Sequence, residues 1–112
     1  MRLRLTLTKS ETNPPYKLKF HPDALEEWRR LDGSVKNIFR RLLKKKLTNP
    51  HSPGSALHGE LKYCYKIKLR KQGYRLVYYV EDEQLVVIVI AIDKREELAA
   101  YKSALARLPK TD

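Results

Sequence analysis

Residues 63–92 read YCYKIKLRKQGYRLVYYVEDEQLVVIVIAI, and their alternating and apolar runs indicate most of a β-sheet. In its first eight residues apolar and cationic side chains alternate, which predicts a strand with Lys66 and Lys68 on the same face. Gly73 suits the positive φ of a tight turn. A second alternating run over residues 74–80 then predicts an antiparallel hairpin.

The rest of the chain completes an α+β pattern. The apolar run over residues 85–92 is typical of a central strand covered on both faces. Residues 16–20 alternate and predict a first strand, and apolar residues at helical spacing predict two helices before residue 48 and one from about 93 to 107. The order β-α-α-β-β-β-α predicts a small antiparallel sheet with two N-terminal helices packed on it and a C-terminal helix.

Specific residues are expected to begin and line these helices. Ser34 is predicted as the N-cap of the second helix, and Asp93 with Glu96 resembles a capping box at the start of the last one. The apolar stripe of the last helix is predicted to comprise Leu98, Tyr101, Leu105 and Leu108.

The 112 residues fit one domain, which we place at residues 16–108. Residues 1–15 read as an N-terminal extension, either an added edge strand or a segment without fixed structure. No apolar run is long enough to span a bilayer. A single cysteine, Cys64, excludes an internal disulfide and suits a reducing, cytoplasmic location. Cys64 is expected to be a small strand residue and not a nucleophile.

Charge is concentrated in the middle of the chain. The formal net charge is +11, and residues 33–80 hold twelve Lys and Arg against one carboxylate, Glu60. A basic middle with neutral flanks is typical of a surface that binds a polyanion. Six of these cations lie on the second predicted helix and are candidates for RNA or ribosome binding: Lys36, Arg40, Arg41, Lys44, Lys45 and Lys46.

The sequence offers little support for metal or cofactor chemistry. The three histidines have no metal-ligand spacing, the four glycines form no phosphate loop, and the predicted basic face lacks carboxylates that would hold magnesium. We therefore expect no metal and no cofactor. Lysines and arginines brought together on one face suit a phosphate, either for cleavage of RNA through its own 2′-hydroxyl or for RNA binding without catalysis.

Three segments resemble the RelE-type toxins of bacterial toxin–antitoxin pairs. They are Cys64–Arg70 (CYKIKLR), Gly73–Tyr78 (GYRLVY) and Asp93–Glu96 (DKRE), within a resemblance that covers about residues 16–108. Ala24 and Leu25, together with Glu27, Trp28 and Arg29, match as well. The resemblance implies a ribosome-dependent endoribonuclease that cuts mRNA in the A site of the 70S ribosome. Its products would carry a 2′,3′-cyclic phosphate and a 5′-hydroxyl.

The resemblance also implies roles for individual residues. Lys68 would transfer protons, Tyr101 would stack on or orient the target base and assist proton removal, and the remaining cations would hold the phosphate. The implied catalytic set is Lys66, Lys68, Arg75, Arg95 and Tyr101. The implied partners are an acidic, RelB-like antitoxin, the ribosome and A-site mRNA, with no membrane. The alternatives are a ParE-type inhibitor of DNA gyrase on the same fold and a non-catalytic RNA-binding or co-repressor module.

Overall fold

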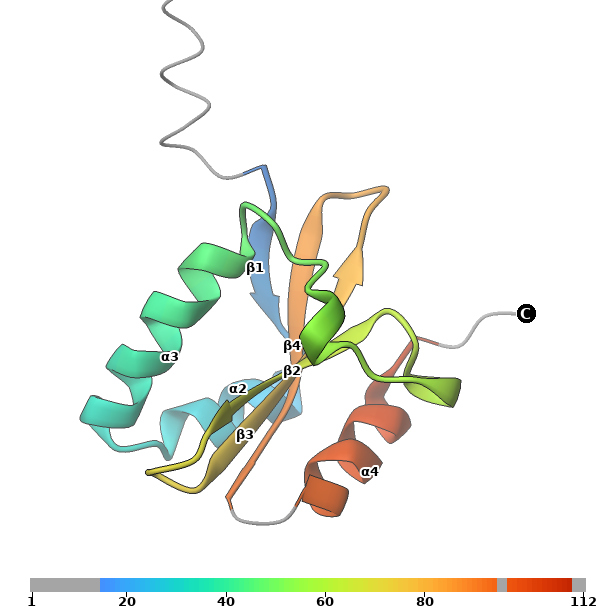
Figure 1. Ribbon diagram of the computed structural model, residues 1–112. Helices are drawn as coiled ribbons and strands as arrows, with labels where there is room; N and C mark the ends of the chain where they lie inside the picture. Colours follow the sequence, from blue (N-terminus) through green and yellow to red (C-terminus); the bar gives the residue numbers. More distant parts are fainter. Residues whose placement is uncertain (1–14, 95–96, 110–112) are drawn as a thin grey trace, which may run out of the picture.

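A computed structural model describes residues 15–94 and 97–109. The predicted extension, apart from Pro15, and the candidate Arg95 therefore lie outside the described residues. The elements are β1 (Lys17–Phe20), α2 (Pro22–Arg29), α3 (Gly33–Lys46), the short 3-10 helices η1 (Pro53–Ser55) and η2 (Gly59–Leu61), β2 (Cys64–Leu69), β3 (Tyr74–Glu81), β4 (Val86–Lys94) and α4 (Glu97–Arg107). This order confirms the predicted α+β pattern (Figure 1).

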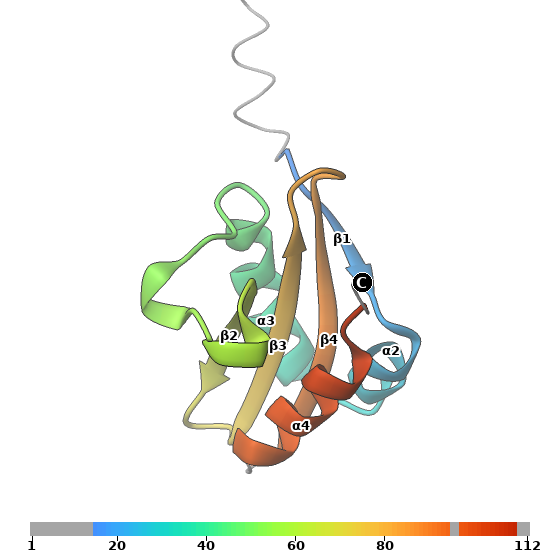
Figure 2. The same cartoon turned by 90° about the vertical axis from the view of Figure 1, so that its right-hand side faces the viewer.

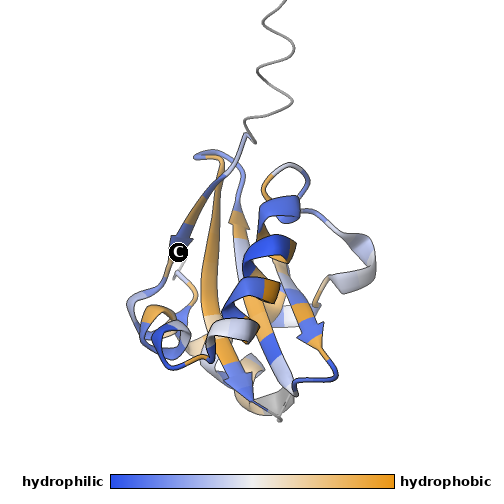
Figure 3. Cartoon of the chain, turned by 90° about the vertical axis from the view of Figure 1, so that its left-hand side faces the viewer, coloured by the Kyte–Doolittle hydropathy of each residue, from blue (hydrophilic) through white to orange (hydrophobic). Residues whose placement is uncertain are grey.

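The four strands form one sheet in the order β1-β4-β3-β2. The β2–β3 and β3–β4 pairs are antiparallel, as predicted for hairpins. The sheet differs from the prediction at β1, which pairs parallel to β4. Only strands joined by a tight turn must be antiparallel, and β1 reaches β4 through two helices and two strands. β4 and β3 are thus the two inner strands of the sheet, and β4 is hydrophobic along nearly its whole length (Figure 3).

One face of the sheet packs on α2 and α3. The face alternation predicted for β2 and β3 is confirmed, because Tyr65, Ile67 and Leu69 join this core together with the alternate residues of β3. From α3 the fully buried side chains are Phe39 and Leu43. Trp28 of α2 packs between Phe39 and the ring of Phe20.

The other face of the sheet packs on α4, which crosses β3 and β4 (Figure 2). A β-bulge in β4 places two successive residues, Ile90 and Ala91, in this second core. Among the α4 side chains that the structure describes, which leave out the predicted stripe residue Leu98, the buried ones are Ala100 and Ala104. Their small size lets the helix lie close to the sheet. The expected stripe residue Leu105 is 41% exposed, so that part of the prediction was wrong.

Two of the predicted helix starts also differ. Asp32 is the N-cap of α3, and the Ser34 hydroxyl donates a hydrogen bond of 2.6 Å to the Asp32 carboxylate. Asp93 is not a helix cap, because it belongs to β4. Both errors arose because a short polar residue before an apolar run can equally be an N-cap, a first-turn residue or the last residue of a strand. Within the described part of the chain, no helix is long and apolar enough to cross a membrane.

Candidate active site

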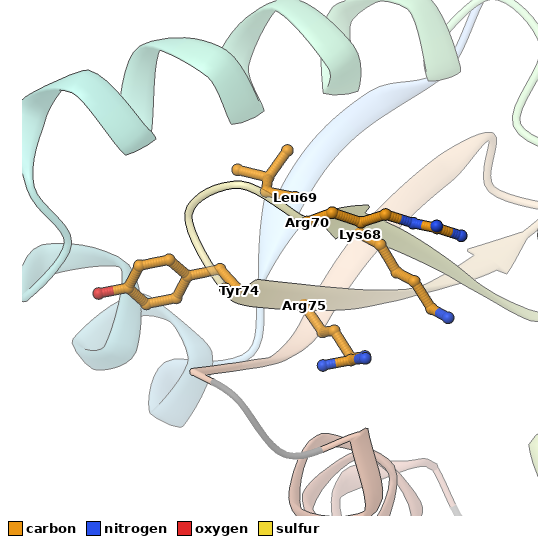
Figure 4. A pocket seen from close by; sticks show the side chains of 6 residues that line it. Lys68, Leu69, Arg70, Tyr74 and Arg75 are labelled. Carbon is orange, nitrogen blue, oxygen red and sulfur yellow. The ribbon is translucent and has the colours of Figure 1, made fainter.

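Lys68 and Arg75 form a cross-strand pair at the closed end of the β2–β3 hairpin. They are direct partners in the register of the two strands, which places their Cβ atoms about 4.5–5.5 Å apart. Both side chains point to the side of the hairpin on which α4 lies, whereas Leu69 points toward α3 (Figure 4). Two half-buried cations in this position form a site suited to an anion with several oxygens.

Lys66 lies two residues before Lys68 and shares its face by strand alternation. Tyr101, on α4, is half-buried against the second core, which includes Cys64 and Val77 of the two strands. Four of the five predicted catalytic residues thus belong to the α4 side of the sheet. The fifth, Arg95, lies outside the described residues, as does the start of the segment that joins β4 to α4.

A cleft opens at the paired cations. Its volume is about 510 Å³, and it is lined by Lys68, Leu69, Arg70, Gly73, Tyr74 and Arg75. The lining combines three cations with an aromatic ring (Figure 4). A Gly73 φ of +75° closes the hairpin as the sequence predicted. The arrangement can bind a phosphodiester and neutralise charge that develops on it.

One carboxylate does lie beside this site, contrary to the prediction. Asp93 is the β4 partner of Arg75, so Lys68, Arg75 and Asp93 form a row across three strands. The Asp93 carboxylate accepts a hydrogen bond of 2.7 Å from the Lys94 amide. The sequence pattern predicted Asp93 as a helix cap, and it gave no indication that Asp93 lies opposite Arg75. Among the described residues, no group of three or more His, Cys, Asp or Glu could hold a metal ion.

The structure confirms that Cys64 is a small strand residue, as predicted. Its side chain is fully buried, and burial raises the pKa of the thiol to about 12. A thiol without access to solvent and with so high a pKa is neither a nucleophile nor a redox centre near neutral pH.

The burial of Cys64 predicts slow alkylation. At pH 8 we expect iodoacetamide to modify the native protein at least about 1,000-fold more slowly than the protein in concentrated guanidinium chloride, because only the thiolate reacts and the unfolded thiol titrates near pH 8.5. Mass spectrometry of timed samples measures both rates. Similar rates in the two conditions would contradict the buried position.

The basic residues of α3 lie on the opposite side of the sheet from Lys68 and Arg75. α3 packs on the first core, and four of its cations, Arg40, Arg41, Lys44 and Lys45, are exposed. Figure 3 shows the hydrophilic stretches of this helix facing away from the sheet. The twelve cations of the middle of the chain are therefore divided between two surfaces, which the sequence pattern did not reveal.

Sequence reasoning missed a polar clamp that joins α2, β4 and α4. The Arg107 guanidinium donates bonds of 3.0 and 2.9 Å to the two oxygens of Glu27 and a third of 2.8 Å to the carbonyl of Ile90, in the β-bulge. Glu27 in turn accepts a 2.9 Å bond from the amide of Ile92. The hydrogen bonds to Glu27 raise the pKa of Arg107. The clamp fixes both ends of the bulge and holds α4 against the sheet.

A second missed network ties β1 to the loops. The Asp82 carboxylate accepts bonds from the Tyr16 hydroxyl (2.7 Å) and from His51 Nε2 (2.8 Å), and His51 Nδ1 lies 2.6 Å from the Tyr65 hydroxyl. Hydrogen bonds from Tyr16 and His51 lower the pKa of Asp82. The residues of this network are up to 66 positions apart in the sequence, so no local pattern predicts their contacts.

Comparison with known proteins shows to which class of protein this fold belongs. Residues 18–99 match the family described as "ParE toxin of type II toxin-antitoxin system, parDE". A putative RelE-like toxin protein of Escherichia coli is 50% identical over 93 residues, covering 83% of this chain and 97% of the relative. The mRNA interferase toxin RelE of E. coli strain K12 is 44% identical over the same shares of each chain.

Two solved structures show the same fold. A doubly substituted variant of E. coli toxin RelE in the free state superposes with a TM-score of 0.77 at 42% identity, covering 85% of this chain and 99% of that one. RelE in the intact E. coli RelBE toxin–antitoxin complex gives a TM-score of 0.69 at 45% identity, covering 73% and 99%. The molecule has the fold of a type II toxin. The chain belongs to the ParE/RelE toxin family, and the relatives compared above are RelE-type toxins.

Proposed function

We propose that this protein is an endoribonuclease that cleaves mRNA in the A site of the ribosome and thereby stops translation. The observation that carries the proposal is the Lys68–Arg75 cross-strand pair at a cleft of about 510 Å³, with Lys66 on the same face. The name mRNA interferase carried by a relative with 44% identity supports the same activity.

The proposed reaction uses the 2′-hydroxyl of the RNA as nucleophile. A base removes the 2′-hydroxyl proton, the 2′-oxygen bonds to the adjacent phosphorus, and the bond from phosphorus to the 5′-oxygen breaks. An acid protonates that 5′-oxygen, so the products are a 2′,3′-cyclic phosphate and a 5′-hydroxyl. All atoms come from the RNA, and no metal is required by this balance.

Each site residue has a role in this proposal. Lys68 transfers protons, since an ammonium group can lose and regain a proton, whereas Arg75 stays charged and binds phosphate oxygens in a bidentate manner. Lys66 and Arg95 add positive charge around the phosphate. Tyr101 orients the base of the cleaved nucleotide and assists proton removal. The charge that develops on the phosphate is stabilised by groups already in place.

The test is cleavage of a defined mRNA on ribosomes with a known A-site codon, followed by mapping of both ends. We expect cleavage only with ribosomes present, and a product with a cyclic phosphate. A matched mRNA that lacks the 2′-hydroxyl at the cleaved nucleotide should stay intact. Cleavage of that deoxy substrate would contradict attack by the 2′-hydroxyl. Intact normal mRNA together with trapped, cleaved DNA in a gyrase assay would favour the ParE-type alternative.

We further propose that the protein acts in the cytoplasm and is restrained by an acidic, RelB-like antitoxin. The net charge of +11 favours an acidic partner. The RelE toxin with 45% identity has been solved in complex with its antitoxin. Co-purification with a small acidic protein from the native host tests this proposal, and recovery of the toxin alone at low salt would oppose it.

The exposed cations of α3 are proposed to bind ribosomal RNA. Substitution of Arg41, Lys44 and Lys45 by glutamate should weaken binding to ribosomes about 10- to 100-fold at moderate salt and flatten its salt dependence, because phosphate contacts release counterions. Cleavage at saturating ribosome concentration should change little, since these residues lie on the other side of the sheet. Sedimentation with ribosomes measures the binding. Equal binding of the variant and the natural protein would disprove the assignment.

A further inference from the structure

Tyr63 is an exposed aromatic residue in a backbone conformation that favours glycine. It directly precedes β2, its φ is +72°, and 58% of its surface is exposed. A bulky residue at positive φ is an outlier, and glycine would adopt this conformation without strain. Its exposure shows that burial in the core is not what keeps the ring at this position.

The ring of Tyr63 borders a small hollow on the protein surface. The hollow has a volume of about 170 Å³ and is lined by Glu60, Lys62, Tyr63, Tyr79, Leu108 and Pro109. Lys62 Nζ lies 5.5 Å from the centre of the Tyr63 ring, within cation–π range. The Tyr79 hydroxyl donates a 3.3 Å bond to Glu81, so this second ring is held in place.

This hollow lies on the same face of the sheet as the candidate active site. Tyr79 packs with the core under α4, and it is the cross-strand partner of Cys64. The next pairs on this face are Lys66 with Val77 and then Lys68 with Arg75. At about 3.3 Å per strand residue, Tyr63 is about 10 Å along the chain from Lys66 and about 16 Å from Lys68. The hollow therefore lies on the same face of the hairpin as Lys66, Lys68 and Arg75, toward the end of the hairpin away from its turn.

We propose that Tyr63 is a stacking platform for a base of the mRNA that flanks the cleaved nucleotide, with Lys62 binding the phosphate beside that base. The inference rests on the proposed function, and it adds a position that contacts the substrate outside the catalytic set. Single-stranded RNA is bound by aromatic rings that stack on bases beside cations that follow the backbone. Glu60, at the edge of the hollow, offers carboxylate oxygens to an amino group of the stacked base.

The experiment uses ribosomes programmed with an mRNA that lacks the 2′-hydroxyl at the cleaved nucleotide. 2-Aminopurine, whose fluorescence falls on stacking, is placed at one position after another around that nucleotide. The natural protein should quench the signal at one flanking position, and Tyr63→Phe should preserve this quenching. Tyr63→Gly should abolish it and lower kcat/KM on cleavable mRNA by about 5- to 150-fold, the range expected for loss of one stacked base.

Leu85→Gly is the matched control. Leu85 also has a positive φ, +56°, and is 44% exposed, but it lies at the turn between β3 and β4. Both glycine variants should unfold at or above the temperature of the natural protein, because both relieve a strained backbone. Only Tyr63→Gly should change the fluorescence and the kinetics.

The outcomes separate this inference from the proposed function. If the natural protein leaves cleavable mRNA intact on ribosomes, the proposed function fails. If it cleaves that mRNA while Tyr63→Gly shows the same quenching and the same kcat/KM, the stacking role of Tyr63 is overturned and the cleavage activity stands.

Discussion

Replacement of Lys68 by alanine is expected to slow mRNA cleavage about 100- to 10,000-fold, the range that a positioned proton-transfer group contributes. Lys68 is half-buried and lies opposite Arg75 in the hairpin register. The substitution should lower the cleavage rate measured at saturating ribosome concentration, because α3 provides other cations for binding the ribosome. Single-turnover cleavage of a defined mRNA on ribosomes measures it.

Lys68→Arg separates proton transfer from charge. Arginine keeps the positive charge and binds phosphate well, but it does not give up its proton in proteins. If Lys68 transfers a proton, the arginine variant should be nearly as slow as the alanine variant. A variant with near-natural activity would show that Lys68 acts only through its charge.

Lys71→Ala is the matched control for the loss of one cation. Lys71 is an exposed residue in the turn of the same hairpin, between β2 and β3. It does not line the cleft. Its removal changes the net charge by the same amount as Lys68→Ala. We expect cleavage to fall by less than about threefold, because an exposed charge is screened by salt. A loss equal to that of Lys68→Ala would mean that general charge, and no particular residue, governs the reaction.

The alternation of side chains made much of this site predictable from sequence. A strand places residues two apart on one face, so Lys66 and Lys68 had to lie together once the strand was recognised. The turn at Gly73 then fixed the pairing of the hairpin and brought Arg75 opposite Lys68. These are local relations, and they depend on few residues.

Relations between distant segments were not predictable in this way. The position of Asp93 opposite Arg75 depends on the register of β3 with β4, which a bulge shifts between Val77 and Tyr78. The parallel pairing of β1 depends on the path of two intervening helices. The exposure of Leu105 depends on which turn of α4 meets the sheet, and the buried alanines of that helix gave no strong hydrophobic signal.

Replacement of Arg107 by alanine is expected to destabilise the fold strongly. The Arg107 side chain is 16% exposed and the Glu27 side chain 24% exposed, and three hydrogen bonds from Arg107 would be lost together. The variant would leave the Glu27 carboxylate and the Ile90 carbonyl in the bulge short of a donor. We expect the free energy of unfolding to fall by about 2–4 kcal/mol, since a partly buried charge without its partner is costly. Urea denaturation followed by circular dichroism measures the change.

Arg29→Ala is the control that makes the origin of this loss clear. Arg29 forms an ion pair with Glu26 at 2.8 Å, a distance close to the 2.9 Å of Arg107 and Glu27, but its side chain is 61% exposed. An exposed pair on one helix contributes about 0.3–0.5 kcal/mol. If distance alone determined the energy, the two alanine variants would lose similar stability. If burial and the bond to the bulge carbonyl determine it, Arg107→Ala should lose several times more.

Arg107→Ala should also weaken cleavage even where the protein stays folded, because the clamp holds α4, and with it Tyr101, against the sheet that carries Lys68 and Arg75.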